Sequence, residues 1–152
     1  MPNRTLFLPA LVLCLICAGV GTSSAATWLD GVWGPDSETI VDKMKPGLSP
    51  ADRQALIEEF ARGVPRHMRV DTAEGTMMTA SDDGVSKLTI VKVETPDPDT
   101  IILHGKGQAG GMSITEWKRL PDGAIGMVTS AAAPSTGVTS SDGKNVLPWV
   151  RR

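Results

Sequence analysis

Two histidines and several methionines are the side chains of this sequence best suited to chemistry. His67, Met78 and His104 fall in segments expected to be neighbouring strands, with Met77 as the other choice beside Met78. Thioether and imidazole groups together suit Cu(I), which prefers soft ligands. Methionine in a small β protein is also ordinary core filling. A periplasmic Cu(I)-binding protein is therefore an alternative hypothesis, and the leading interpretation assigns no metal site.

The run from Gly105 to Gly110 matches the dinucleotide-binding pattern G-x-G-x-x-G. That chemistry needs a helix to begin at the run, because the first amides of the helix face the pyrophosphate. The residues that follow, Met112 to Thr115, alternate as a strand does. The sequence therefore predicts a glycine hairpin loop here, with no nucleotide and no other cofactor.

Acidic pairs and serine chemistry give weaker alternatives. Asp82-Asp83 and Asp97/Asp99 lie in turn-like segments, where Asp is favoured for its local hydrogen bonds to the backbone. Acid-pair glycoside chemistry needs carboxylates that face each other across a cleft. Serine hydrolysis needs a base, for which His67 and His104 are the candidates, and the sequence has no G-x-S-x-G. We expect no catalytic residues and no enzyme, with a small envelope hydrolase as the alternative.

The N-terminal segment has the pattern of a secretory signal peptide. Arg4 precedes an apolar run from Leu6 to Val20, and Ser24 and Ala26 are the small residues that suit cleavage before Thr27. A membrane-spanning helix needs about 20 apolar residues, and this run is shorter. We therefore expect residues up to 26 to be removed, a periplasmic or secreted location, and no stable membrane insertion after cleavage.

Both cysteines lie within that leader. Removal of Cys14 and Cys17 leaves a chain with no disulfide, no thiolate metal site and no cysteine nucleophile. Taking 26 of the 152 residues away leaves 126, which suits a single domain over 27–152. A chain of this length buries about two-thirds of its surface on folding, so an ordinary hydrophobic core can stabilise it.

The charge distribution argues against nucleic acid as a partner. The leader holds one of the 15 cations and none of the 17 acids, so the remaining chain has a net charge of −3. No basic cluster exceeds Arg151-Arg152. Binding to nucleic acid depends largely on neutralising phosphates, and this sequence offers no surface for that.

Two helices are predicted early in the exported chain. The first spans 37–44 and is capped by Asp36. The second spans 50–62, and Gly63 is expected to end it in the left-handed conformation. One side of the second helix is apolar, so we expect it to cover one face or end of a sheet. The apolar positions are Leu56, Ile57 and Phe60.

From residue 67 the pattern changes to short β segments separated by turns. Strands are expected near 67–71, 74–80, 85–94, 100–105, 112–120 and 124–129. The connections are too short for parallel crossovers, so neighbouring strands must be antiparallel. A short strand ending at Gly34-Pro35 precedes them, 131–145 is expected to be a flexible loop, and 146–150 is a candidate final strand. The expected fold is an α+β meander of about six strands, forming a barrel or half-barrel with one or two N-terminal helices packed on it.

Two irregularities are predicted in the 85–94 strand and after it. Leu88 and Ile90 share one face while Val91 and Val93 share the other, which indicates either a bulge or a strand buried on both faces. The run 96–99 contains two prolines, and proline cannot donate to a ladder. We therefore expect this run to break the sheet.

Gly31-Val32-Trp33 is a G-x-W motif at the start of the meander. In this the chain resembles the lipocalins, whose tryptophan closes one end of a β barrel, and it looks closer still to the short lipocalin-like proteins that many bacteria export. The resemblance covers residues 28–129 and departs from the family pattern where two helices follow the first strand. It implies an apolar interior able to hold a small ligand. Trp33 and Trp117 are also expected as plain core filling, because the exported chain has one Phe and no Tyr.

These features favour an exported, non-catalytic binding module. The expected ligand is a small apolar molecule, and the second choice is an envelope protein. The ligand-binding residues are not predicted by any motif.

Overall fold

A computed structural model describes residues 27–129 and 136–152. The expected signal peptide lies outside the described residues, and so does the segment 130–135, which includes the first residues of the expected flexible loop. Within the described ranges, no helix is long and apolar enough to cross a membrane.

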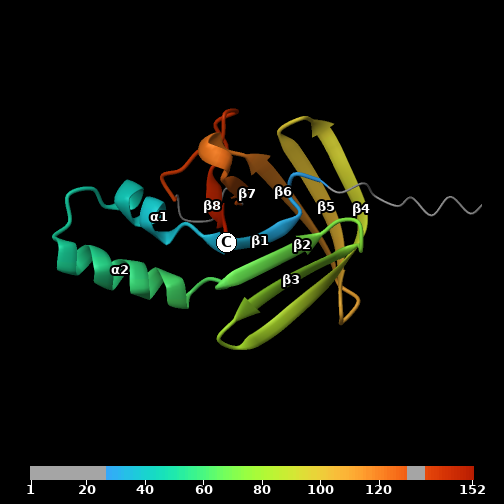
Figure 1. Cartoon of the computed structure of the whole chain (residues 1–152), viewed down its shortest axis with the longest axis horizontal. Coiled ribbons are helices and arrows are strands. Elements are labelled where there is room, and N and C mark those ends of the chain that lie inside the picture. Colours follow the sequence, from blue (N-terminus) through green and yellow to red (C-terminus); the bar gives the residue numbers. More distant parts are fainter. Residues whose placement is uncertain (1–26, 130–135) are drawn as a thin grey trace, which may run out of the picture.

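Eight antiparallel strands form a closed barrel, in which consecutive strands are neighbours and β8 returns to β1 (Figure 1). The strands are β1 (Gly31–Pro35), β2 (His67–Asp71), β3 (Thr76–Ser81), β4 (Gly84–Asp97), β5 (Thr100–Gly107), β6 (Met112–Arg119), β7 (Ile125–Val128) and β8 (Val146–Arg151), with a short 3-10 turn, η1 (Pro121–Gly123), between β6 and β7. The antiparallel barrel is confirmed. The expected number of about six strands is wrong, because the first and last strands are full members of the wall and close it by pairing Trp33 with Arg151.

Strand β4 contains the bulge that the sequence indicated. Its pairing with β5 shifts register between Ile90 and Lys92. Val91 takes up the extra position and is 54% exposed, while Ile90 and Val93 both pack against the core. One inserted residue therefore reverses which positions of β4 face the core. The alternative, a strand buried on both faces, is wrong.

The expected break at 96–99 is also wrong. Strand β4 runs through Pro96 to Asp97, beside a second register shift between Glu94 and Asp97. A shift of this kind is where a strand tolerates proline. Pro98 and Asp99 alone form the turn, in which the Asp99 amide donates to the Asp97 carboxylate (2.9 Å).

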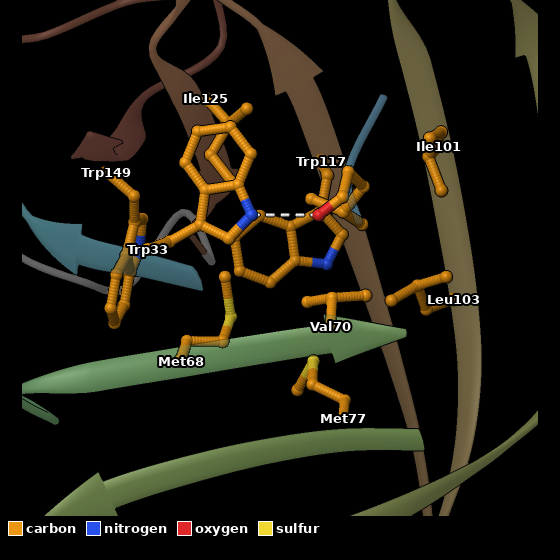
Figure 2. Packing of buried hydrophobic residues seen from close by; sticks show 10 residues of the cluster. Trp33, Met68, Val70, Met77, Ile101, Leu103, Trp117, Ile125 and Trp149 are labelled. Atoms are coloured by element: carbon orange, nitrogen blue, oxygen red, sulfur yellow. Dashed lines mark hydrogen bonds between the residues drawn. The ribbon is translucent and has the colours of Figure 1, made fainter. Parts of the chain in front are cut away.

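Side chains from every strand fill the barrel (Figure 2). The buried members of the cluster are Leu29, Trp33, Met68, Val70, Met77, Ile101, Leu103, Trp117, Ile125 and Trp149. The indole N–H of Trp33 donates to the Leu29 carbonyl (2.8 Å), the dashed line in Figure 2. The indole N–H of Trp149 is buried and has no hydrogen-bond partner among the described residues.

Arg151 covers the Trp33 ring, with its guanidinium carbon 4.6 Å from the ring centroid. The first residue of the G-x-W motif makes room for this contact. Gly31 has φ +140°, and a Cβ there would come within 2.9 Å of Arg151 Nη1. The motif therefore combines a buried indole with a glycine that admits the cation above it.

Helices α1 (Ser37–Met44) and α2 (Pro50–Arg62) begin and end as the sequence predicts. Asp36 caps α1 by accepting from the Thr39 amide (3.2 Å), and Ser49 caps α2 by accepting from the Asp52 amide (3.2 Å). Together they form an arm beside the barrel (Figure 1), in which α1 contacts β8 and α2 packs mainly on α1. No residue of α2 is fully buried, so the expectation that this helix covers a face or end of the barrel is wrong.

The expected left-handed end of α2 is wrong as well. Gly63 has φ −91° and ψ −5°, which any residue adopts, and its N–H donates to the Phe60 carbonyl (3.0 Å). A tightened last turn therefore ends the helix without any need for glycine.

The described part of the expected loop, residues 136–145, is held against the outer wall of the barrel. Lys118 is 8% exposed, donates to the Thr100 hydroxyl (2.8 Å) and pairs with Asp142 (2.9 Å). The Ser140 hydroxyl and then the Lys118 cation lower the pKa of Asp142 to about 2. Asp142 is therefore charged at neutral pH and holds its segment on β6.

Candidate functional site

The inside of the barrel was the ligand site implied by the resemblance. A small cavity lined by residues of β3, β4, β5 and β6 measures about 10 Å³, roughly the space that one water needs. Its lining residues are Met77, Leu88, Ile90, Leu103, Gly105, Ser113 and Thr115. Pockets for small ligands measure about 300–1,000 Å³. This part of the interior is therefore packed core, which is common in barrels of eight strands.

The three side chains considered as copper ligands are not brought together. His67 and Met78 lie on the paired strands β2 and β3, whereas His104 lies on β5. Along β4, Met78 is opposite Lys87 and His104 is opposite Lys92, five residues further on. At about 3.3 Å per residue this displacement is roughly 17 Å along the strand. Within the part described, no group of three or more His, Cys, Asp or Glu side chains is placed to hold a metal ion.

The glycine run joins β5 to β6, so the predicted hairpin loop is confirmed. The Gly107 amide donates to the Gly111 carbonyl (2.8 Å), and β6 begins at Met112. Gly105 lies in the barrel wall, where a Cβ would come within 2.6 Å of the Leu88 Cδ2. The first glycine of the run therefore serves core packing, and no helix follows that could bind a pyrophosphate.

The two acidic turns lie at opposite ends of β4. Asp82 pairs with Arg66 (2.6 Å) at one end. At the other end, a hydrogen bond from the Thr100 side chain is the main cause that lowers the pKa of Asp97. The 14 residues of β4 separate them by on the order of 40 Å. These carboxylates therefore do not face each other as an acid pair.

A histidine–carboxylate pair that the sequence did not indicate lies on the outer wall. His104 Nε2 is 2.6 Å from Glu94 Oε1, and Lys92 Nζ is 2.9 Å from the same oxygen. Lys92, and after it His104, lowers the pKa of Glu94. Hydrolysis would also need a nucleophile at the imidazole. The neighbours of His104 across the sheet are Lys92 and Ile114, neither of which carries a hydroxyl or thiol.

An apolar groove lies between the two helices of the arm. It measures about 330 Å³ and is bounded by the last turn of α1 and the middle of α2. Its lining residues are Val41, Met44, Lys45, Leu56, Glu59 and Phe60. Met44 is 46% exposed, and neither Lys45 nor Glu59 forms an ion pair within the part described. The groove therefore offers an apolar surface with one cation and one anion beside it.

An arginine fixes the spacing of the two helices. Arg53 of α2 pairs with Asp42 (2.6 Å) and Glu38 (3.2 Å), which lie one turn apart on α1. The hydrogen bond from Arg53 lowers the pKa of Asp42. Exposed ion pairs of this kind stabilise little but fix geometry when they form a fork.

The sequence did carry a signal for this groove. The sequence predicts the apolar stripe of α2, and in the structure this stripe faces α1 and not the barrel. The pattern of one helix shows that a face is apolar but does not identify the element that the face meets.

Comparison of the chain with protein-family models, with curated proteins and with solved structures gives no match.

Proposed function

We propose that this protein is an exported, lipocalin-like, non-catalytic binding module that holds a small apolar ligand in the groove between α1 and α2. The contrast between two spaces carries the proposal. The groove offers about 330 Å³ with a largely apolar lining, whereas the cavity beside Met77 and Leu103 in the barrel offers about 10 Å³. The ligand site therefore lies on the arm rather than within the barrel.

The size of the groove favours a small molecule over a protein partner. Its volume falls within the range of small-ligand pockets, about 300–1,000 Å³. Helix α1 has 8 residues, so it is about 12 Å long, and its face covers on the order of 100 Å². A stable protein interface buries about 800 Å² on each partner. Lys45 and Glu59 at the edge suit a ligand with a polar end.

The barrel serves as a rigid support for the arm. The Asp36 amide donates to the Pro148 carbonyl of β8 (3.0 Å), which attaches the start of α1 to the wall. Ile40 of α1 is 0% exposed. The first helix is thus anchored, and the groove forms on the side of it that faces α2.

Uptake of a neutral apolar fluorophore, N-phenylnaphthylamine, tests the proposal. We expect saturable binding that Phe60→Gln weakens about tenfold or more, because a polar amide replaces apolar lining. Val85→Gln is the matched control, since Val85 is 70% exposed and lies on β4, outside the groove. Melting curves of both variants establish that they are folded.

Unchanged uptake by Phe60→Gln would refute the site on the arm. If Leu103→Gln in the barrel core abolished uptake by a folded protein while Phe60→Gln did not, the ligand would lie inside the barrel.

The export part of the proposal has a separate test: N-terminal sequencing of protein from the envelope should begin at Thr27, and an intact Met1 would contradict it.

A further inference from the structure

A charged pocket of about 500 Å³ lies on the other side of α2 from the groove. The last turn of α2, the residue before β2 and the residue after β8 each contribute an arginine: Arg62, Arg66 and Arg152. Glu58 lines this pocket and Leu56 lines the groove. Two residues apart on a helix are about 200° apart around its axis, so the two spaces are separate.

Three arginines and one glutamate line the pocket. Among the described residues, Arg62 and Arg152 form no ion pair, and Arg66 shares one with Asp82 (2.6 Å). Glu58 is the carboxylate that lines the pocket with them. The whole chain has a net charge of −2, so this concentration of positive charge is local and does not follow from composition.

Arg152 reaches the pocket by crossing β1 at Gly34, which has no side chain. Its amide donates to the Val32 carbonyl (3.0 Å), which extends the pairing of β1 with β8 by one residue. Its guanidinium lies over Gly34, and a Cβ at Gly34 would overlap it. Gly34 does not have a positive φ, so its backbone conformation does not require glycine. What glycine contributes at this position is the space left by the missing side chain.

We propose that this pocket binds a phosphate group. The planar fork of a guanidinium matches phosphate with two parallel hydrogen bonds, and the several oxygens of phosphate can serve more than one arginine. Three cations against one carboxylate side chain in the lining also attract an anion electrostatically. The recognised chemistry is the same whether the phosphate belongs to a free compound or to the head group of an anionic phospholipid.

Calorimetric titration with inorganic pyrophosphate tests the site, and flotation with vesicles separates the two sources. The vesicles contain phosphatidylglycerol, or phosphatidylcholine alone as the neutral comparison. We expect Arg62→Gln with Arg152→Gln to weaken binding about tenfold or more, since each removes charge-assisted hydrogen bonds. Gly34→Ala should weaken it without changing any charge, because the new methyl group displaces Arg152. Arg119→Gln, on β6, is the control for loss of charge alone.

Each outcome has a defined meaning when melting curves show that the variants are folded. Binding of pyrophosphate alone, lost in the pocket variants, supports a free phosphate compound. Binding of phosphatidylglycerol vesicles with the same losses supports a lipid head group. The proposal is overturned if neither probe binds, or if Arg119→Gln weakens binding as much as the pocket variants do. Uptake of N-phenylnaphthylamine is unaffected by this result, so the two sites are tested independently.

Discussion

The two buried indoles at the closure of the barrel provide a sharp test of how the core is stabilised. Trp33 and Trp149 are 1% and 2% exposed, so burial of the two rings is nearly equal. Their N–H groups differ. The N–H of Trp33 donates to the Leu29 carbonyl (2.8 Å), and that of Trp149 has no partner among the described residues.

The same substitution at both positions isolates that difference. Trp→Phe removes similar apolar area and leaves a similar cavity at each site, so these costs largely cancel. Trp33→Phe also leaves the Leu29 carbonyl without its donor. A buried polar group without a partner costs about 1–3 kcal/mol. Trp149→Phe instead removes a group that already carries such a cost. We therefore expect Trp33→Phe to lower the free energy of unfolding by at least about 2 kcal/mol more than Trp149→Phe does.

Urea denaturation followed by far-UV circular dichroism measures the two free energies. Tryptophan fluorescence is unsuitable, because the substitutions remove the reporting groups. Trp117→Phe should fall between the two, since its N–H donates to the Thr115 hydroxyl (2.9 Å), which can turn to another partner. Equal losses at Trp33 and Trp149, with unchanged m-values, would refute the reasoning.

Gly105→Ala should lower the free energy of unfolding by about 1–3 kcal/mol through overlap with Leu88, as measured by urea denaturation; a neutral result would contradict the close packing. Asp142 has a pKa lowered to about 2 from 3.8, so its contribution to stability is present above about pH 4 and is lost as the pH falls towards 2. Melting temperatures across this range should therefore fall less in Asp142→Asn than in the parent, and parallel curves would show that the contact with Lys118 does not stabilise the fold. Gly63→Ala should leave the melting temperature unchanged or raise it, because φ is −91° there, and a marked drop would restore the left-handed end of α2.

Local signals in the sequence were sufficient for most of the wall. The start of each helix follows from Asp36 and Ser49, whose caps act within one turn of the chain. The bulge at Val91 could be inferred, because alternation of buried positions is a property of one strand. Closure of the barrel could not be inferred, since pairing of Trp33 with Arg151 depends on the register of every strand between them.

The candidate sites show the same division. The apolar stripe with Phe60 was visible in the sequence, but its partner is a helix whose own pattern is short, at 8 residues. The pocket of arginines draws Arg62, Arg66 and Arg152 from three elements, and only the folded chain brings them together. The opposite case is the alternative copper site. The sequence suggested that its ligands would meet, but the strand register keeps them apart: His67, Met78 and His104.

Closure of the barrel by its last strand also has a kinetic consequence. The strand β8 supplies one neighbour of β1 and is the last strand in the order of the chain. Pairing between distant segments is slow, because the entropy of closing a long loop is lost before any contact compensates for it. Under the proposed export, the chain would thus stay unfolded while it is threaded across the membrane, and folding would finish only after residues 146–151 had emerged.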